Sequence, residues 1–256
     1  MTTCTIDLSD AQLLRYSRHI LLAELGPEAQ QRFAAAHALV VGAGGLGAPS
    51  AQFLAAAGIG TITLCDADDV DLTNLQRQIL YATQDIGTRK VEAAARRLLA
   101  VNPEIRIERV AARVGAPELA SLVGEADVVL DCSDNFETRH AVNAACVRGR
   151  KPLVSGAAVR FDGQVAVFDA RDPDAPCYHC LFGEGEELEE TRCATMGVFA
   201  PLVGIVGSMQ AAEALKIVAG VGRTLRGRLM IVDALDMRIR ELAVPRDPSC
   251  PVCGER

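Results

Sequence analysis

The sequence has few of the residues that several kinds of enzyme and binding protein require. It contains four histidines among 256 residues, and none of them is spaced to pair with an acid or a nucleophile. A histidine-based catalytic triad is therefore not expected. Lysine and arginine number 26 against 33 acidic residues, which gives a net charge of −7. Such a chain lacks the basic surface that displaces counterions from nucleic acid, so a nucleic-acid partner is not expected either.

No secretory signal is expected either, because no basic region followed by a long apolar run opens the sequence. Two uncharged stretches, 38–65 and 193–212, are interrupted by glycine and proline. A membrane-spanning helix needs about 20 consistently apolar residues. We interpret both stretches as buried elements of a soluble domain, and we expect a cytoplasmic protein with no membrane partner.

Segments typical of strands and helices alternate along the chain. The pattern predicts strands over 38–41, 61–65, 105–110, 127–132 and 152–158. One predicted helix ends near Ala57, and two others cover 88–101 and 136–148. Later strands are predicted over 164–169, 228–233 and 237–244. This order predicts an α/β fold, with a Rossmann-like, mostly parallel sheet covered by helices on both faces. The later strands continue it in antiparallel fashion.

The first predicted helix covers residues 9–25. Ser9 and Gln12 have the spacing of a capping box, which is typical of a helix start. Apolar residues then recur on one helical face, and Arg18 falls in the same stripe. Arg18 either lies at the edge of the stripe with its charge in solvent or reaches toward an anion.

A glycine-rich loop, Gly42-Ala-Gly-Gly-Leu-Gly47, follows the first strand and opens a helix. Glycine permits the tight turn, and the free N–H groups and the helix dipole favour an anion there. Asp66 lies 19 residues after Gly47 at the end of the second strand, where a carboxylate accepts hydrogen bonds from a ribose. The pattern predicts a nucleotide site, and by itself suggests NAD. The glycines in question are Gly42, Gly44, Gly45 and Gly47.

The residues after Asp66 are not typical of a dehydrogenase. Four carboxylates, Asp66, Asp68, Asp69 and Asp71, fall within six positions and precede Asn74, Arg77 and Gln78. Arg89 and Lys90 then lie in the first turn of a helix expected to be capped by Thr88. Cations at the positive end of a helix dipole are unfavourable. Two of them near a nucleotide loop therefore indicate that an anion lies between.

Asp134 and Asn135 follow the strand over 127–132. Ligands of open α/β sheets bind beyond the carboxyl ends of the strands. A carboxylate at that edge could place Mg²⁺ between phosphate oxygens. The alternative is that Asp134 caps the following helix, and the two roles are compatible.

Two Cys-x-x-Cys pairs, Cys177 with Cys180 and Cys250 with Cys253, stand out among nine cysteines. Four thiolates give closed tetrahedral coordination of Zn²⁺ with no open position, so we expect a structural zinc site. The alternative is a set of unrelated buried thiols.

Cys193 stands apart from these pairs. It follows an acidic loop with five glutamates over Glu184–Glu190 and precedes an apolar helix expected from about Gly197. A thiol near a helix N-terminus can act as a nucleophile, and a small buried core residue is the alternative. The loop is either a solvated crossover or a segment that a partner orders.

In combination, these motifs resemble the MoeB/ThiF adenylyltransferases, bacterial relatives of the ubiquitin-activating enzymes. Arg15-Tyr-Ser-Arg18, the glycine loop, Asn74-Leu-Gln-Arg77-Gln78, Lys90, Asp131-Cys-Ser-Asp134-Asn135 and both cysteine pairs occur in the family's order from end to end. The chain looks closer to the molybdopterin branch than to the thiamine branch.

The resemblance implies ATP with Mg²⁺ as cosubstrate and a ubiquitin-like sulfur-carrier protein ending in Gly-Gly as the other substrate. The carrier's carboxylate attacks the α-phosphate, giving an acyl-adenylate and pyrophosphate. By the same resemblance, Asp66 holds the ribose, while Asn74, Arg77 and Lys90 bind phosphates. Asp68, Gln78 and Asn135 complete the expected nucleotide site.

The resemblance also implies that Asp134 places Mg²⁺ and that Arg18 reaches the site of the other subunit in a homodimer. Cys193 matches the position where some members form a covalent link to the carrier. The appended sulfurtransferase domain of some relatives is absent from this sequence, so a separate sulfurtransferase or cysteine desulfurase is expected to supply sulfur.

We expect a single domain over 1–256, with a nucleotide-binding half over 37–150 and a carrier-binding and zinc-binding half over 151–256. Three alternatives stay open. They are the same chemistry on a thiamine-pathway or other carrier, an NAD-dependent oxidoreductase, and a nucleotide-binding scaffold without turnover.

Overall fold

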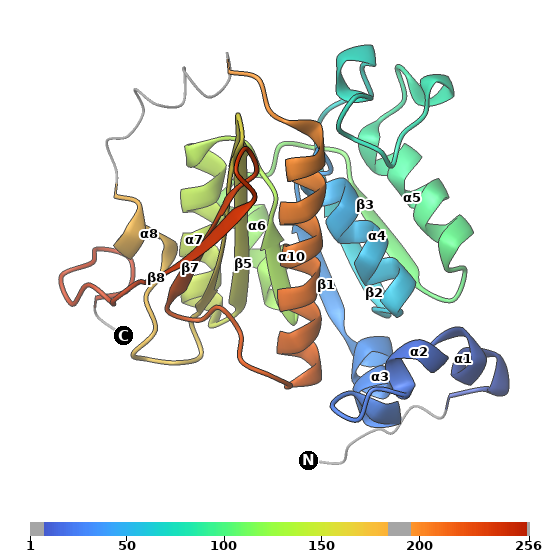
Figure 1. Ribbon diagram of the computed structural model, residues 1–256, viewed down its shortest axis with the longest axis horizontal. Helices are drawn as coiled ribbons and strands as arrows, with labels where there is room; N and C mark the ends of the chain where they lie inside the picture. The colour runs from blue at the N-terminus through green and yellow to red at the C-terminus, as the bar shows by residue number, and fades with distance from the viewer. Residues whose placement is uncertain (1–7, 184–195, 255–256) are drawn as a thin grey trace.

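The computed structural model describes residues 8–183 and 196–254, and its strands form one sheet in the order β3-β2-β1-β4-β5-β6-β7-β8 (Figure 1). The strands are β1 (His37–Val41), β2 (Thr61–Cys65), β3 (Arg106–Val110), β4 (Val128–Asp131), β5 (Pro152–Val159), β6 (Asp162–Asp169), β7 (Arg228–Asp233) and β8 (Arg238–Ala243). Pairing is parallel from β3 through β5 and antiparallel from β5 through β8. The predicted fold class is confirmed.

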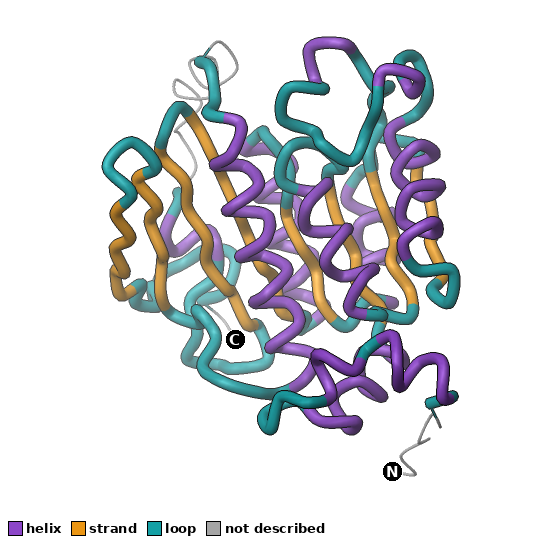
Figure 2. The backbone as a smooth tube through the Cα atoms, turned by 45° about the vertical axis from the view of Figure 1, so that its right-hand side comes forward, coloured by secondary structure: helices purple, strands orange, loops and turns teal. Residues whose placement is uncertain are grey.

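Helices cover both faces of the sheet (Figure 2). One face carries α4 (Gly47–Ala57), α5 (Lys90–Val101) and α10 (Ala200–Ala219), and the other carries α6 (Ala116–Glu125), α7 (Phe136–Gly149) and the short α8 (Tyr178–Leu181). Successive residues of β1 alternate between these two cores, with Ala38 and Val40 in the first and Leu39 and Val41 in the second. Because side chains of a strand alternate between faces, a strand buried on both sides is apolar throughout.

The N-terminal region differs from the single helix predicted over 9–25. It forms α1 (Asp10–Arg15), α2 (Ser17–Ile20) and α3 (Gly26–Ala35). The capping box at Ser9 is confirmed, but the first helix ends at Tyr16, whose backbone (φ −97°, ψ 10°) is not helical. Tyr16 is buried and its hydroxyl accepts a hydrogen bond from Asn102 Nδ2. This distant contact anchors Tyr16 and interrupts the helix.

The helix that carries Lys90 begins two residues later than the sequence indicated. Its N-cap is Arg89, with no side-chain capping bond, so the expected cap at Thr88 is wrong. The Thr88 carbonyl instead accepts a hydrogen bond from Val70 N–H, and Arg89 pairs with Asp69 in a short antiparallel bridge. These contacts hold the chain extended up to Arg89. The helices α3 and α6 were not predicted.

The helix α10 is the one helix in the described part of the chain that is long and apolar enough to cross a membrane, with a mean hydropathy of 1.4. Half of the 18-residue apolar segment that passes this test is buried within the protein. The helix packs on β5, β6 and α4 (Figure 1). It therefore serves as a core helix, as the interrupted apolar pattern indicated.

Candidate functional site

The candidate site lies where the carboxyl ends of β2, β1 and β4 meet. Val41 at the end of β1 pairs with Cys65 of β2 on one side and with Asp131 of β4 on the other. In the sheet, β2 lies on one side of β1 and β4 lies on the other side. The strand order therefore reverses at β1, and the edge between β1 and β4 is the topological switch point of the sheet. The glycine loop, Asp66 and Asp134 therefore all emerge at one edge.

Two glycines of the loop are required by the backbone itself. Gly42 has a φ of +92°, and a Cβ there would lie 2.7 Å from the carbonyl oxygen of Cys132. A Cβ on Gly47 would overlap the carbonyl oxygen of Gly42, so α4 can begin close to the sheet only with glycine at this position. A Cβ on Gly44 would meet nothing nearer than Gln78 Nε2 at 3.5 Å. Gly44 thus faces space that the folded chain leaves open.

Replacing Gly44 by alanine is expected to preserve the fold and weaken nucleotide binding about tenfold. The structure accommodates the methyl group, but a phosphate approaching the backbone N–H groups would meet it. Isothermal titration with ATP and thermal melting measure the two effects. Gly47→Ala is the contrasting variant, because its Cβ overlap is expected to lower the melting temperature. Unchanged ATP affinity in Gly44→Ala would contradict a phosphate site at this loop.

Lys90 connects the start of α5 to the carboxylates that follow β2. Its Nζ lies 2.7 Å from Asp68 Oδ2 and 3.9 Å from Asp66 Oδ1, and the side chain is 6% exposed. Asp66 accepts hydrogen bonds from the backbone N–H groups of Ala43 and Asp68, at 2.8 and 2.9 Å. Burial raises the pKa of Asp66 above its ordinary value, while the Lys90 charge opposes this rise. The sequence-predicted Asp66, Asp68 and Lys90 thus form one cluster with the glycine loop.

The segment between β2 and α5 carries Asn74, Arg77 and Gln78. The backbone carbonyl of Asn74 accepts hydrogen bonds from the backbone N–H groups of Arg77 and Gln78. The side-chain Oδ1 of Asn74 accepts a hydrogen bond from Asp71 N–H at 3.2 Å. Arg77 Nη1 donates to the carbonyl of Thr73 at 3.2 Å. Gln78 is 3% exposed, and its Oε1 is buried with no hydrogen-bond partner among the described residues. The Gln78 amide group thus lies beside Gly44, with its Nε2 nearest to the glycine and its Oε1 without a partner in the described part of the chain.

The structure decides which of Asp134 and Asn135 caps the helix that follows β4. Asn135 caps α7, because its Oδ1 accepts from Thr138 N–H at 2.9 Å. The interpretation of Asp134 as the helix cap is therefore wrong. The Asp134 side chain is exposed, and its Oδ1 accepts a 3.4 Å hydrogen bond from Asn135 Nδ2. Its carboxylate remains accessible at the carboxyl end of β4.

Arg18 does not join this cluster within its own chain. Arg18 lies on α2, which packs near the beginning of β1, whereas the glycine loop lies at the end of β1 (Figure 1). Cys193 and the acidic loop Glu184–Glu190 lie outside the described residues. One contact that the sequence did not predict is a 2.7 Å hydrogen bond from Tyr81 Oη to the carbonyl of Ala43. No spacing rule links a tyrosine to a carbonyl 38 positions earlier.

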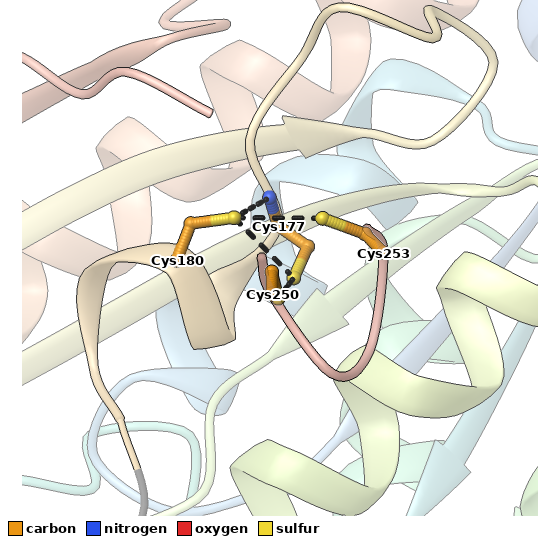
Figure 3. A group of neighbouring side chains, drawn as sticks. All are labelled: Cys177, Cys180, Cys250 and Cys253. Carbon is orange, nitrogen blue, oxygen red and sulfur yellow. Dashed lines mark hydrogen bonds between the residues drawn. The ribbon is translucent and has the colours of Figure 1, made fainter. Parts of the chain in front are cut away.

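The four paired cysteines converge at a second place, on α8 and near the end of the described chain (Figure 3). We call Cys177, Cys180, Cys250 and Cys253 the cysteine cluster. Their Sγ atoms all lie within 4.8 Å of one another, and three measured separations are 3.4, 3.7 and 3.9 Å. A tetrahedron with Zn–S bonds of about 2.3 Å has edges of about 3.8 Å. The donor set and its spacing fit a zinc ion.

Hydrogen-bond donors surround the sulfur atoms of the cysteine cluster. Asn143 of α7 is buried, and its Nδ2 lies 3.6 Å from Cys177 Sγ while its Oδ1 accepts from Tyr178 N–H. The backbone N–H of Asp247 donates to Cys180 Sγ at 3.5 Å. Burial raises the pKa of the Cys177 thiol, so thiolates at this place require a compensating cation. The arrangement suits a closed structural metal site.

The fold and the site define a nucleotide-binding α/β protein with a separate cysteine cluster. The ThiF family model matches residues 16–252, and the chain belongs to this family. The match confirms the family predicted from the sequence.

Two curated relatives are similar to this chain over nearly their whole length. The molybdopterin-synthase adenylyltransferase of Escherichia coli is 44% identical over 252 residues, covering 97% of this chain and 99% of that protein. The sulfur carrier protein adenylyltransferase of Thermus thermophilus is 46% identical over 248 residues, covering 95% and 92%. A crystal structure of Escherichia coli MccB with ATP matches with a TM-score of 0.83 and 28% identity, covering 94% of this chain and 74% of that chain. The chain is accordingly an enzyme of the adenylyltransferase class.

Proposed function

We propose that this adenylyltransferase uses ATP to adenylate the C-terminal glycine carboxylate of a ubiquitin-like sulfur-carrier protein, releasing pyrophosphate. The observation that carries the proposal is the buried Lys90 ammonium beside the glycine loop. A buried cation next to free backbone N–H groups at a helix start is suited to a polyphosphate. The carrier class is supported by the names of the two relatives, which state a molybdopterin synthase and a sulfur carrier.

The reaction requires alignment and charge neutralisation rather than an added base. The carrier carboxylate is already ionised, and its oxygen bonds to the α-phosphorus while the bond to pyrophosphate breaks. Two anions must approach each other, so positive charge and fixed geometry lower the barrier. Lys90 and Arg77 would neutralise phosphate oxygens, and Asn74 would donate to them. Asp66 would accept from the ribose hydroxyls.

Asp134 fits a magnesium ion that arrives with ATP. Mg²⁺ in nucleotide sites is held by one or two carboxylates together with phosphate oxygens. Asp134 offers an exposed carboxylate at the switch point, and Asn135 is engaged as the cap of α7. The ion supplies charge neutralisation at the phosphates.

A zinc ion in the cysteine cluster would have a structural role.

Pyrophosphate exchange into ATP, measured against a panel of candidate Gly-Gly carriers, tests the proposed function. We expect exchange that depends on Mg²⁺ and on one carrier, and its loss when the carrier's terminal glycine is removed. NADH binding without any exchange would instead favour an oxidoreductase. ATP binding with no exchange for any carrier would favour a scaffold.

We further propose a homodimer in which Arg18 reaches the site of the other subunit. Leu13 and Leu14 of α1 and Leu21 and Leu22 directly after α2 are exposed, with Leu14 at 77% and Leu21 at 75%. Exposed apolar residues gathered in one short region suit a protein interface. The position of α2 near the start of β1 keeps Arg18 away from the site of its own chain.

A subunit-mixing experiment is expected to show that Arg18 acts across the interface. Arg18→Ala and Asp134→Asn dimers should each be nearly inactive, whereas random mixing gives dimers in which one site has both residues. Roughly a quarter of the wild-type exchange rate should return, because half of the dimers are mixed and each has one intact site. Two different affinity tags verify that mixed dimers form. Mixed dimers without recovered activity would place Arg18 outside the partner's site.

The remaining assignments are also proposals. The chain acts as a single domain, with the nucleotide half over 37–150 and the carrier and zinc half over 151–256. It works in the cytoplasm in molybdopterin cofactor synthesis, and a separate enzyme supplies the sulfur. Adenylation of a thiamine-pathway carrier is the alternative that the carrier panel distinguishes. Cys193 would serve a covalent link to the carrier after adenylation.

A further inference from the structure

Ala43 in the glycine loop is held from both sides by side chains outside the loop. Its N–H donates to Asp66 Oδ2 at 2.8 Å. Its carbonyl accepts from Tyr81 Oη at 2.7 Å. Asp66 belongs to the expected nucleotide site, but Tyr81 has no role in the reaction described above. The loop is thus fixed partly by a residue that the chemistry does not use.

Tyr81 is well placed to act as a fixed donor. It is 6% exposed, and its ring belongs to the core that packs α4 and α5 against the sheet. Burial, together with the nearby Asp66 charge, raises the pKa of Tyr81, so the hydroxyl keeps its proton. A protonated hydroxyl beside a carbonyl oxygen must donate to it.

The hydrogen bond at the Ala43 carbonyl also determines where the next N–H points. The peptide between Ala43 and Gly44 is planar and trans, so the Gly44 N–H is directed opposite to the Ala43 carbonyl. Throughout residues 8–183 and 196–254, this N–H has no hydrogen-bond acceptor. Tyr81 therefore orients an unpaired backbone donor in the loop that precedes α4.

The turn that carries Tyr81 is itself anchored on α5. Asp85, which is 3% exposed, accepts from the backbone N–H of Ala82 at 2.9 Å. The same carboxylate contacts Arg96 and Arg97 of α5, at 3.0 and 3.4 Å. The helix α5 begins at Lys90. The glycine loop, the Tyr81 turn and the Lys90 helix are thus connected by short polar contacts.

We propose that Tyr81 is a positioning residue for ATP, which acts by fixing the Ala43–Gly44 peptide so that the Gly44 N–H points at a phosphate oxygen. The inference rests on the proposed function, because it requires a triphosphate at the glycine loop. Its effect belongs to nucleotide binding and not to carrier binding or to the bond-forming step.

The test compares Tyr81→Phe with Tyr16→Phe. Both tyrosines are 6% exposed, and each substitution removes one buried hydroxyl hydrogen bond. Only Tyr81 contacts the glycine loop, whereas Tyr16 bonds Asn102. Isothermal titration with a non-hydrolysable ATP analogue gives the dissociation constant. Pyrophosphate exchange gives KM for ATP, KM for the carrier and the rate at saturation, normalised to the folded fraction from circular dichroism.

For Tyr81→Phe we expect KM and the dissociation constant for ATP to rise about five- to tenfold, the effect of one well-placed hydrogen bond. The carrier KM and the saturated rate should stay within about twofold. For Tyr16→Phe the ATP constants should not change. Equal ATP affinity in wild type and Tyr81→Phe, or equal losses in both variants, would overturn the positioning role. Failure of the wild-type enzyme to bind ATP would instead contradict the proposed function.

Discussion

Replacing Asp134 by asparagine is expected to lower acyl-adenylate formation by about 100-fold or more, while the melting temperature changes little. The substitution keeps the size of the side chain but removes the negative charge that would hold Mg²⁺. Stability is expected to persist because Asp134 is exposed and Asn135, not Asp134, caps α7. Radiolabelled acyl-adenylate formation and thermal melting measure the two quantities.

Asp174→Asn is the matched control for this prediction. Asp174 is also exposed, and it lies in the turn before Cys177, away from the switch point. The same loss of one charge should leave adenylation unchanged there. Asn135→Ala, in contrast, should lower the free energy of unfolding by about 1 kcal/mol, because it removes the N-cap of α7. Full activity of Asp134→Asn would remove Asp134 from the mechanism.

Loss of one ligand from the cysteine cluster is expected to have the largest effect on stability. The purified protein should contain one zinc per chain, and Cys250→Ser should lose it. Structural zinc sites contribute directly to folding free energy. With a loss of about 3–5 kcal/mol, a domain of this size should melt roughly 10 °C lower. Elemental analysis and calorimetry, with and without a strong chelator, provide the measurements.

Cys146→Ala separates the effect of the metal from the effect of a buried thiol. Cys146 is 1% exposed in the core around α7 but is not part of the cysteine cluster. Its replacement should leave the zinc content unchanged, and the chelator should lower the melting temperature of this variant as much as that of the wild type. A protein that contains no zinc, or a Cys250→Ser variant as stable as wild type, would exclude the structural site.

Most of the fold was predictable because its strands are buried on both faces and punctuated by local signals. The strand over Thr61–Cys65 was predicted with its observed bounds. The N-terminal helix was not, because its interruption at Tyr16 depends on Asn102, 86 positions away. The helix α5 begins two residues later than predicted for a similar reason, because the bridge between Asp69 and Arg89 keeps the chain extended. Local propensity cannot foresee such contacts.

The candidate site was likewise predictable where local patterns define it and not where distant contacts do. Spacing rules connect the glycine loop to Asp66 and pair the cysteines, because each rule reflects a local requirement on the backbone or on a ligand set. Lys90 was suggested by its unfavourable place at a helix start, and the structure shows its compensation by Asp68. The role of Tyr81 could not be predicted, because its partner is a backbone carbonyl that no residue type announces. The cap on α7 could be assigned only from the structure, because Asp134 and Asn135 both have side chains that cap helices.

The ordering of the sheet leaves β3 and β8 as its two outer strands. An outer strand with unpaired N–H and carbonyl groups can recruit a strand from another molecule and start aggregation. Both strands carry opposite charges in close succession, with Arg106 and Glu108 on β3 and Arg240 and Glu241 on β8. A foreign strand would have to strip water from these charges. Addition of a foreign strand at either outer edge of this sheet is therefore disfavoured by the cost of removing water from these charges.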